Sequence, residues 1–424
     1  MQVRLEYGRT GLDVTLPDDR VVKCLGYGCA APVADPDAVV RRALMHPHNS
    51  PSLAAIARGC RSACVVISDV TRPVPNQVIL PPLLGTLEAS GVPREKITVL
   101  IGTGLHRPNP GQELAEMVGP KVMAGYRIEN HDGHDRSQHV HLGVSPRGVP
   151  LWIDRRYVEA QLKITTGLIE PHFMAGFSGG RKAICPGIAA VETVRAWHSP
   201  RFLEHPDARC GRLEGNPVHE EVTWIARRVG CDFIVNAVMN ERREILALFA
   251  GHPEEAFWDG TRFVRRLVTD VVPRPVDIVV TCGAGYPLDT TFYQCVKGMV
   301  GAMEIVKPGG TIILAAGMEE GVGSAPFQRL FEENASLDAF MHRIQHEDYF
   351  VPDQWQLEEL AKVRRKAKVK VITQGLPPEK IARLFVESAP TVEQAVADSL
   401  AEYGPQASIA VIPKGPYVLA EVAR

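Results

Sequence analysis

An apolar run, Ile164-Thr-Thr-Gly-Leu-Ile169, leads directly into the segment Glu170-Pro-His-Phe-Met-Ala-Gly-Phe-Ser-Gly-Gly-Arg-Lys182. The run has the length and composition of a buried strand, so we expect a strand that ends where the polar segment begins. The segment sets His172 and Lys182 ten residues apart around a glycine-rich turn. In an open α/β sheet, ligands bind beyond the carboxyl ends of the strands. The sequence therefore predicts a binding site just past this strand.

Three further strand-like runs end in polar residues in the same way. They cover residues 63–68, 97–101 and 277–281. One such loop is usually only a solvated connection between elements. Four of them favour a functional site at the shared sheet edge. We expect one cleft to be lined by Asp69, Arg72, His106, His172 and Lys182.

Length and composition are those of a globular protein with sizeable cores. The chain has 424 residues, of which 45% are hydrophobic, enough for two or three domains. The net charge of −2 gives no support for binding nucleic acid or an anionic membrane. The amino terminus lacks the layout of a signal peptide, and no apolar run approaches the roughly 18 to 20 residues of a spanning helix. We expect a cytoplasmic protein whose nine scattered cysteines are reduced thiols.

Strand candidates alternate with helix candidates, which predicts βαβ units and mostly parallel sheets. Helical spacing of apolar residues occurs at 78–89 and 190–197, and residues 5–16 read as an opening β-hairpin. The doubled proline in Val271-Val-Pro273-Arg-Pro275 predicts an interdomain linker. A second series of strands follows it, at 278–281, 310–315, 369–373 and 407–412.

The fold class predicted from this pattern is α/β, with two α/β domains and an active-site cleft between them. The N-terminal domain covers 1–270 and carries the lysine and histidines named above. The C-terminal domain covers 276–405, and a tail at 406–424 is expected to pack back on the N-terminal domain.

Two local patterns have an alternative reading. Gly176-Phe-Ser178-Gly-Gly180 matches the letters of a hydrolase nucleophile elbow, but residues 170–175 separate it from the strand, so we favour a flexible glycine loop. Four histidines lie between His131 and His141 and suggest a metal site. No cysteine or suitably spaced carboxylate accompanies them, so we favour a polar surface strand.

A helix is predicted to begin within the segment Tyr286-Pro-Leu-Asp-Thr-Thr-Phe-Tyr-Gln-Cys-Val-Lys297, with residues 289–291 as N-cap candidates. Gln294 and Lys297 would then project from one face of its first turns. An amide and an ammonium near a helix start suit a carboxylate or a phosphate. A solvent-facing helix start explains the same residues equally well.

Together these motifs resemble the nickel-dependent lactate racemase family, which comprises racemases and epimerases of 2-hydroxy acids. The resemblance covers nearly the whole chain, and the motifs follow the family's order and spacing. Asp353-Gln-Trp355-Gln matches a further segment of the family. The motifs that carry the resemblance are Asp69-Val-Thr-Arg72-Pro, Gly102-Thr-Gly-Leu-His106, Pro171-His172 through Lys182, His198 and Tyr293-Gln294-x-x-Lys297.

The resemblance implies a covalent nickel-pincer nucleotide, a pyridinium-3-thioamide-5-thiocarboxylic acid mononucleotide that carries nickel and is made by separate biosynthetic enzymes. Lys182 matches the lysine linked to this cofactor, and His198 matches the nickel ligand. His106 and His172 match the two acid/base histidines. Residues on the cofactor side are Asp69, Ser178, Gly179 and Gly180, and those on the substrate side are Arg72, Tyr293, Gln294, Lys297 and Trp355. Whether the glycine loop or Arg181 takes the phosphate stays open, as does the oligomeric state.

The implied reaction inverts a 2-hydroxy acid through the planar 2-keto acid. A base removes the hydroxyl proton while a hydride leaves for the cofactor, and return of the hydride to the other face gives the enantiomer. Two enantiomers point their hydroxyls in different directions, so two histidines are needed. Arg72 would hold the substrate carboxylate bidentately, and Lys297 would add a point charge.

The substrate expected from these residues is lactate or a related short aliphatic 2-hydroxy acid, since no additional arginine near the motifs suits a second carboxylate. Malate, an aromatic acid or a sugar acid is the alternative. Met174 stands where we expect an aromatic or small polar residue, so the pocket beside His172 is expected to differ from that of relatives. Two other functions fit some of the same residues: a Schiff-base lyase that uses Lys182 and His172, and a carboxylate-binding protein without turnover.

Overall fold

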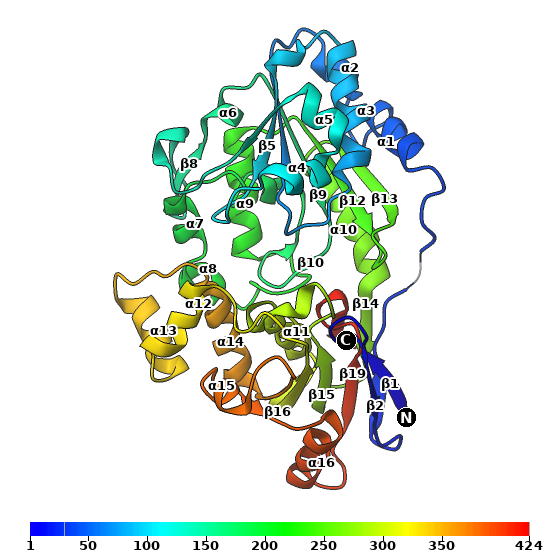
Figure 1. Ribbon diagram of the computed structural model, residues 1–424, viewed down its shortest axis with the longest axis vertical. Helices are drawn as coiled ribbons and strands as arrows, with labels where there is room; N and C mark the ends of the chain where they lie inside the picture. Colours follow the sequence, from blue (N-terminus) through cyan, green and yellow to red (C-terminus); the bar gives the residue numbers. More distant parts are fainter. Residues whose placement is uncertain (29, 424) are drawn as a thin grey trace. The chain divides into compact units, whose positions relative to one another are not determined.

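The computed structural model describes residues 1–28 and 30–423, which form two compact units (Figure 1). The Lys182 unit comprises 29–198 and 206–264, and the Lys297 unit comprises 1–28, 199–205 and 265–424. Each unit contains a six-stranded sheet. In the part of the chain that the structure describes, no helix is long and apolar enough to span a bilayer.

The sheet of the Lys182 unit is parallel except at one edge, where β13 runs antiparallel to β12. Its strands, in spatial order, are β13 (Ile245–Gly251), β12 (Phe233–Met239), β9 (Leu162–Leu168), β4 (Ala63–Ser68), β5 (Ile97–Gly102) and β6 (Arg127–Asn130). Its helices are α1 (Pro36–Met45), α2 (Leu53–Ala57), α3 (Asn76–Ala89), α4 (Gly111–Val118), α5 (Pro120–Gly125), α6 (Arg155–Val158), α7 (Val191–Trp197), α9 (Pro217–Val229) and most of α10 (Glu255–Val268). Two small hairpins, β7 (His139–Val144) with β8 (Pro150–Asp154) and β10 (Pro171–His172) with β11 (Gly176–Phe177), complete the strands.

The two faces of this sheet are covered differently. Alternate residues of the strands, such as Val65 and Ile164, join Val40 of α1 and Leu83 of α3 in one apolar core. The opposite face receives α6 and a short 3-10 turn, η3 (Gly180–Ala183), which packs on β4, β9 and β12. The glycine-rich segment therefore folds back onto the strand that precedes it, and this return places Lys182 at the sheet.

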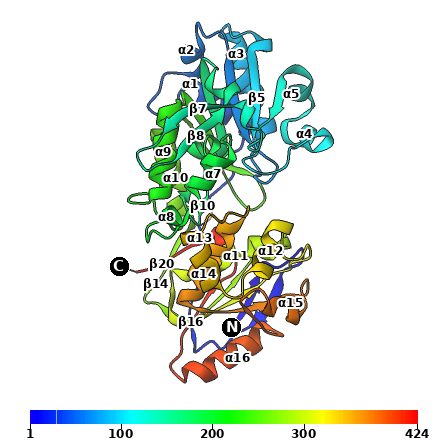
Figure 2. The ribbon, with the colours of Figure 1, turned by 90° about the vertical axis from the view of Figure 1, so that its left-hand side faces the viewer.

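The sheet of the Lys297 unit is parallel throughout. Its strands, in spatial order, are β18 (Glu387–Ser388), β17 (Lys368–Ile372), β16 (Val306–Ala315), β15 (Val276–Cys282), β19 (Ile409–Ile412) and β3 (Val21–Cys24). The helices are α8 (Pro200–Leu203), α11 (Phe292–Met303), α12 (Ala325–Glu333), α13 (Leu337–His346), α14 (Gln354–Lys366), α15 (Pro378–Ala382) and α16 (Val392–Tyr403). A further parallel pair, β14 (Thr269–Val272) with β20 (Leu419–Val422), lies side by side in Figure 2.

Both faces of the sheet in the Lys297 unit are apolar, and each is covered by other elements of the unit. Helices α11 and α14 pack on β16. On the other face, α16 and the hairpin of β1 (Gln2–Leu5) and β2 (Leu12–Thr15) share one core with the sheet. Leu5 of the hairpin, which is fully buried, contributes to that core together with Val280 and Val411.

The two-domain α/β class, the opening hairpin and most strand positions are confirmed, whereas the two units depart from the predicted domain limits. Residues 1–28 belong to the Lys297 unit, because β3 pairs in parallel with β19. The tail pairs with β3 and β14, which the prediction placed in the N-terminal domain and which lie in the Lys297 unit. The chain passes between the units within α10, near residue 264, and not at the prolines near 273.

The assignment of the amino terminus to the Lys297 unit can be tested with Leu5→Ala. Loss of a fully buried leucine costs about 2–5 kcal/mol of local stability because it leaves a cavity. We expect faster amide hydrogen exchange in β15 and β19 and unchanged exchange in β4 and β9. Val22→Ala, at a side chain that is 38% exposed, is the control. Equal acceleration in both units would contradict the assignment.

Candidate active site

Three adjacent parallel strands bring the predicted residues of the Lys182 unit to one sheet edge. The strands β9, β4 and β5 are neighbours in the sheet, and their carboxyl ends point the same way. Asp69 follows β4, His106 follows β5, and His172 follows β9. The edge predicted from the sequence is therefore the edge at which these side chains gather.

Asp69 and His106 are in direct contact. His106 Nδ1 lies 2.7 Å from Asp69 Oδ2, and Thr71 Oγ1 donates to Asp69 Oδ1 at 2.6 Å. Burial alone would raise the pKa of Asp69, but the hydrogen bonds and charges of His106, Thr71 and Arg72 outweigh it and hold the pKa below its usual value. An ionised Asp69 therefore faces His106 at neutral pH. The histidine itself remains about half exposed at 55% of its side-chain surface, so its other edge can meet a ligand.

Arg72 lies beside this pair on the same loop. Its Nη1 donates to the Thr71 carbonyl oxygen at 3.1 Å, and its Nε lies 3.9 Å from Glu170 Oε1. The guanidinium retains 36% of its side-chain surface, which leaves room for a carboxylate. Glu170 arrives from β9, so Arg72 lies between the loops of two neighbouring strands.

The glycine loop is held in a shape that only glycine permits at two positions. Gly176 has φ +75°, and a Cβ there would lie 2.1 Å from the Arg212 carbonyl oxygen. Gly179 has φ +91°, and a Cβ there would lie 2.9 Å from the Leu168 carbonyl oxygen. Ser178 Oγ donates to that same carbonyl at 2.8 Å and accepts from the Glu170 amide at 3.1 Å. Ser178 thus links the loop to the strand through its hydroxyl, which is consistent with a glycine loop rather than a nucleophile elbow.

The buried side chain of Arg181 forms hydrogen bonds with the backbone of the glycine loop. Its guanidinium donates to the carbonyl oxygens of Gly179, Ala175 and Phe177 at 3.3, 3.4 and 3.2 Å and lies 4.0 Å from the Phe257 ring centroid. Burial lowers the pKa of Arg181 to about 9. Because both Nη atoms donate to backbone carbonyls, Arg181 stabilises the conformation of the loop.

His172 and Lys182 meet across the loop. Lys182 Nζ lies 3.0 Å from His172 Nε2, and the amides of Met174 and Ala175 both point at His172 Nδ1 from 3.2 Å. The Lys182 ammonium position also lies 5.1 Å from the Trp197 ring centroid. The Met174 side chain is only 1% exposed, so it packs into the unit's core.

His198 ends α7 and is almost fully buried. Its Nδ1 donates to the Val194 carbonyl oxygen at 3.0 Å, so its Nε2 carries the lone pair. Burial lowers the pKa of His198 to about 3. The ring is therefore neutral at physiological pH and in the tautomer that ligates metal ions through Nε2.

The Lys297 unit carries the remaining predicted residues around the start of α11. Thr291 is the N-cap, and its Oγ1 accepts from the Gln294 amide at 3.4 Å, which confirms the predicted helix start. Trp355 Nε1 donates to the Tyr293 hydroxyl at 3.2 Å, so these two aromatic residues adjoin. Among the described residues, no donor reaches the buried Gln294 Oε1. Lys297 follows Gln294 on the next turn and is half-buried.

The histidine-rich segment is not the polar surface strand that we predicted. His131 and His139 are buried and meet edge to face, with 5.0 Å between ring centroids. His131 Nδ1 lies 3.1 Å from the buried carboxylate of Asp154, which also pairs with Arg156. His134 and His141 are exposed, and His141 stacks on Trp152. Across residues 1–28 and 30–423, no group of three or more histidine, cysteine or acidic side chains is arranged to hold a metal ion.

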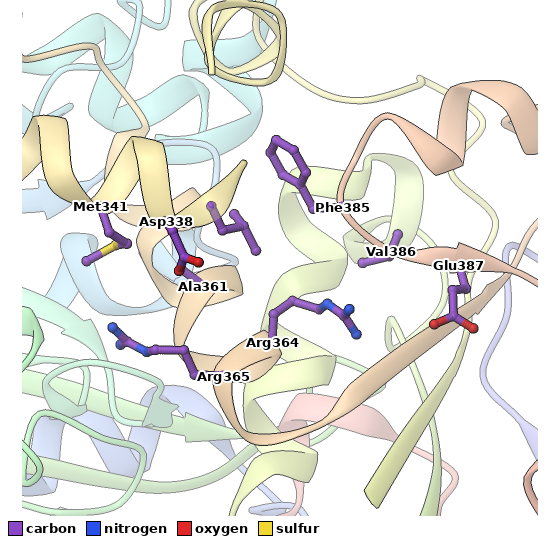
Figure 3. Close-up of a pocket in the computed structure, with 9 residues that line it drawn as sticks. Asp338, Met341, Ala361, Arg364, Arg365, Phe385, Val386 and Glu387 are labelled. Atoms are coloured by element: carbon purple, nitrogen blue, oxygen red, sulfur yellow. The ribbon is translucent and has the colours of Figure 1, made fainter. Parts of the chain in front are cut away.

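An open groove of about 540 Å³ in the Lys297 unit is lined by none of these residues (Figure 3). Met341 and Ala361 line it from α13 and α14, and Phe385 lines it from the segment before β18. Its two arginines are already engaged, because Arg364 donates to the Ala367 carbonyl oxygen and Arg365 pairs with Glu204. The groove therefore offers no cluster of catalytic groups.

Several residues of the site were missed from the sequence. Thr71 and Glu170 contact predicted residues, and Trp197 lies beside Lys182. Asn236, fully buried in β12, accepts from the Gly180 amide at 3.2 Å. The contact of Thr71 could have been predicted from the sequence, since a hydroxyl two residues after an aspartate commonly bonds to it. The contact of Asn236 could not, because Asn236 reaches the glycine loop only through the pairing of strands in the sheet.

Comparison with known proteins matches both parts of the chain to one family. Residues 7–211 match the lactate racemase N-terminal domain, and residues 271–420 match the lactate racemase C-terminal domain. A lactate racemase of Thermoanaerobacterium thermosaccharolyticum is 35% identical over 421 residues, 98% of each chain. A lactate racemase of Lactiplantibacillus plantarum is 36% identical over 378 residues, 89% of each chain.

Solved structures agree with the sequence matches. The lactate racemase apoprotein from T. thermosaccharolyticum superposes with a TM-score of 0.93 at 34% identity, covering 99% of this chain and 100% of that one. A protein from Thermotoga maritima superposes with a TM-score of 0.69 at 18% identity, covering 93% of this chain and all of that one. The second likeness extends to the fold alone.

The depressed pKa of His198 predicts a pH-dependent stability. Below about pH 6.5 the unfolded chain binds a proton at this histidine that the folded chain does not, so stability falls by up to about 1.4 kcal/mol per pH unit. Between about pH 7.5 and 5, His198→Asn should therefore lose about 2 kcal/mol less of its free energy of unfolding than the unmodified protein. Urea unfolding at both pH values measures this, with the exposed His141→Asn as control. An identical pH dependence in all three proteins would refute the burial effect.

Proposed function

The chain belongs to the lactate racemase family, and we propose that it interconverts the enantiomers of lactate or of a related short aliphatic 2-hydroxy acid. The observation that carries this proposal is a pair of histidines at the ends of nearby parallel strands, each oriented through its Nδ1 by a different partner. A two-base isomerase needs two such groups, one for each enantiomer. The Lys182 amine beside His172 adds the attachment point that a covalent cofactor requires.

The residues present fit a nickel-pincer nucleotide. Lys182 would carry the covalent link, His198 Nε2 would ligate the metal, and the backbone of Ser178 to Gly180 would approach the nucleotide. Because the described residues offer no multi-residue metal cluster, a nickel ion at His198 would take its remaining donors from the nucleotide. When bound, this group supplies an electrophilic centre that accepts and returns a hydride.

The chain's own residues handle the proton and the carboxylate. His106 would take the hydroxyl proton of one enantiomer, and His172 would return a proton to the oxygen of the other. Arg72, half-exposed beside His106, would bind the substrate carboxylate through two parallel hydrogen bonds. From the resemblance, Tyr293, Gln294, Lys297 and Trp355 would contribute further substrate contacts. The acceptor Gln294 Oε1 suits a hydroxyl or amide donor.

The preference for a short aliphatic acid rests on the same residues. Of the two arginines in the motifs, Arg181 is buried and donates to loop carbonyls, so only Arg72 is placed to bind a carboxylate. Malate would need a second arginine for its second carboxylate. The Met174 side chain is buried in the core, so it adds apolar bulk behind the His172 loop and no polar group for a sugar acid.

The deciding experiment is to produce the protein with the cofactor-synthesis enzymes and nickel, and to follow L-lactate with a chiral assay. We expect D-lactate to form until the enantiomers are equal. Malate, mandelate and a sugar acid, tested in parallel, would identify a different substrate within the family. A preparation that carries stoichiometric nickel and cofactor yet interconverts none of these acids would overturn the proposal.

Lys182→Ala should abolish covalent cofactor while leaving the fold intact, because only a nucleophilic amine can form the linkage. Intact mass of protein made with the synthesis enzymes measures the adduct, and circular dichroism checks the fold. The exposed Lys121→Ala should keep the full adduct. An adduct that persists in Lys182→Ala would remove this lysine from its role.

Arg72→Lys should raise the KM for lactate by about 10- to 100-fold, since a charged hydrogen bond is worth about 1.5–3 kcal/mol and an ammonium cannot replace the two-pronged contact. Arg107→Lys is the matched control, because Arg107 lies on the neighbouring loop and is paired with Glu113. Similar kinetics for both variants would show that Arg72 does not hold the carboxylate.

A further inference from the structure

We propose that the two acid/base histidines are fixed in opposite tautomers before substrate binds, with Asp69 as the positioning residue for His106. In this arrangement His106 presents a lone pair at Nε2, whereas His172 presents an N–H at Nε2. The catalytic meaning rests on the proposed function. The tautomers themselves are properties of the protein without cofactor, so they can be measured independently.

On the His106 side, a carboxylate dictates the tautomer. Asp69 is buried, with 4% of its surface exposed, and an ionised carboxylate can only accept hydrogen bonds. Its Oδ1 is engaged by Thr71, whose hydroxyl and amide donate from 2.6 and 3.2 Å. Its Oδ2 faces His106 Nδ1 at 2.7 Å. His106 must therefore carry a proton on Nδ1, and in the neutral ring its Nε2 is an acceptor.

On the His172 side, the backbone dictates the opposite tautomer. The amides of Met174 and Ala175 both donate toward His172 Nδ1, so Nδ1 must hold its lone pair. A neutral ring then carries its proton on Nε2, which lies 3.0 Å from Lys182 Nζ. An ammonium has no lone pair, so this arrangement requires the uncharged amine of Lys182, which accepts the hydrogen bond from Nε2–H. Asn216 Nδ2 holds the Met174 carbonyl oxygen at 2.8 Å, and Arg181 holds that of Ala175 at 3.4 Å. The Met174 carbonyl and the Ala175 amide share one peptide plane, so the Asn216 bond keeps the Ala175 amide aimed at the ring.

A racemisation needs one nitrogen that accepts the hydroxyl proton and another that donates a proton on the opposite side. The opposite tautomers supply this division before any substrate arrives. The protein as folded is therefore set to receive the enantiomer whose hydroxyl faces His106.

The test is nitrogen-15 NMR of the cofactor-less protein with labelled histidine, in which the two ring nitrogens of each tautomer differ in shift and coupling. Signals are assigned by their loss in His106→Gln and His172→Gln. We expect His106 to carry its proton on Nδ1 and His172 on Nε2 at neutral pH. The same tautomer in both rings, or rapid averaging in either, would overturn the proposal.

Asp69→Asn provides a second experiment, with a readout that would not change if Asp69 had only a structural role. The Thr71 donors would claim the amide oxygen, so the amide NH₂ would face His106 and drive its proton to Nε2. We expect this tautomer change in the spectrum and a loss of racemisation by about a hundredfold or more in the loaded enzyme. Asp69→Asn/Thr71→Val should restore part of both, because the amide can then turn. The exposed Asp132→Asn is the control.

The outcomes separate this inference from the proposed function. Opposite tautomers in a loaded protein that racemises nothing would leave the inference standing and remove the function. Racemisation by a protein whose His106 keeps its tautomer in Asp69→Asn would leave the function standing and remove Asp69 as its positioning residue.

Discussion

Parallel hydrogen bonding among β9, β4 and β5 is the constraint on which the Lys182 unit depends. The register pairs Ala63 of β4 with Leu162 of β9 and with Ile97 of β5, so the three strands run in step. One face of these strands is covered by α1 to α3. The sheet therefore fixes the position at which each loop begins. The side chains of Asp69, His106 and His172 are therefore placed by the sheet, and their loops need only orient them.

Local hydrogen bonds then supply the orientation. Thr71 and Asp69, which contact each other, are only two residues apart in the sequence. His172 likewise contacts the amides of residues two and three positions later. Arg181 does similar work for the glycine loop, at the cost of a buried guanidinium that lies over Phe257. A buried polar group of this kind is tolerated only when its donors find acceptors. The loop carbonyls accept hydrogen bonds from both Nη atoms of Arg181, so backbone atoms contribute to the rigidity of the site together with side chains.

The sequence predicted what is local and periodic. Strands such as β9 and β15, helix α3 and the N-cap of α11 follow from apolar spacing and capping residues, and the site residues followed from their positions after strands and from the family resemblance. Contacts between segments that are far apart in the sequence were not predicted. Nothing in the apolar pattern of residues 21–24 indicates that they join β19, and Asn236 meets the glycine loop only because β12 lies beside β9. The buried state of His131 was not predicted for the same reason, since its partners Asp154 and Ala189 lie further along the chain.

The Lys297 unit is closed by the two ends of the polypeptide, and this has a consequence for biosynthesis. Strand β3 hydrogen-bonds to β19, and β14 hydrogen-bonds to β20, which lies at the very end of the described chain. Domains form largely in the order in which they leave the ribosome. The Lys182 unit is complete once residue 264 has emerged, whereas strand β3 precedes this unit in the chain and must wait for β19, which follows it. The half of the protein that bears the lysine can thus mature on the nascent chain before the sheet of the other half is complete.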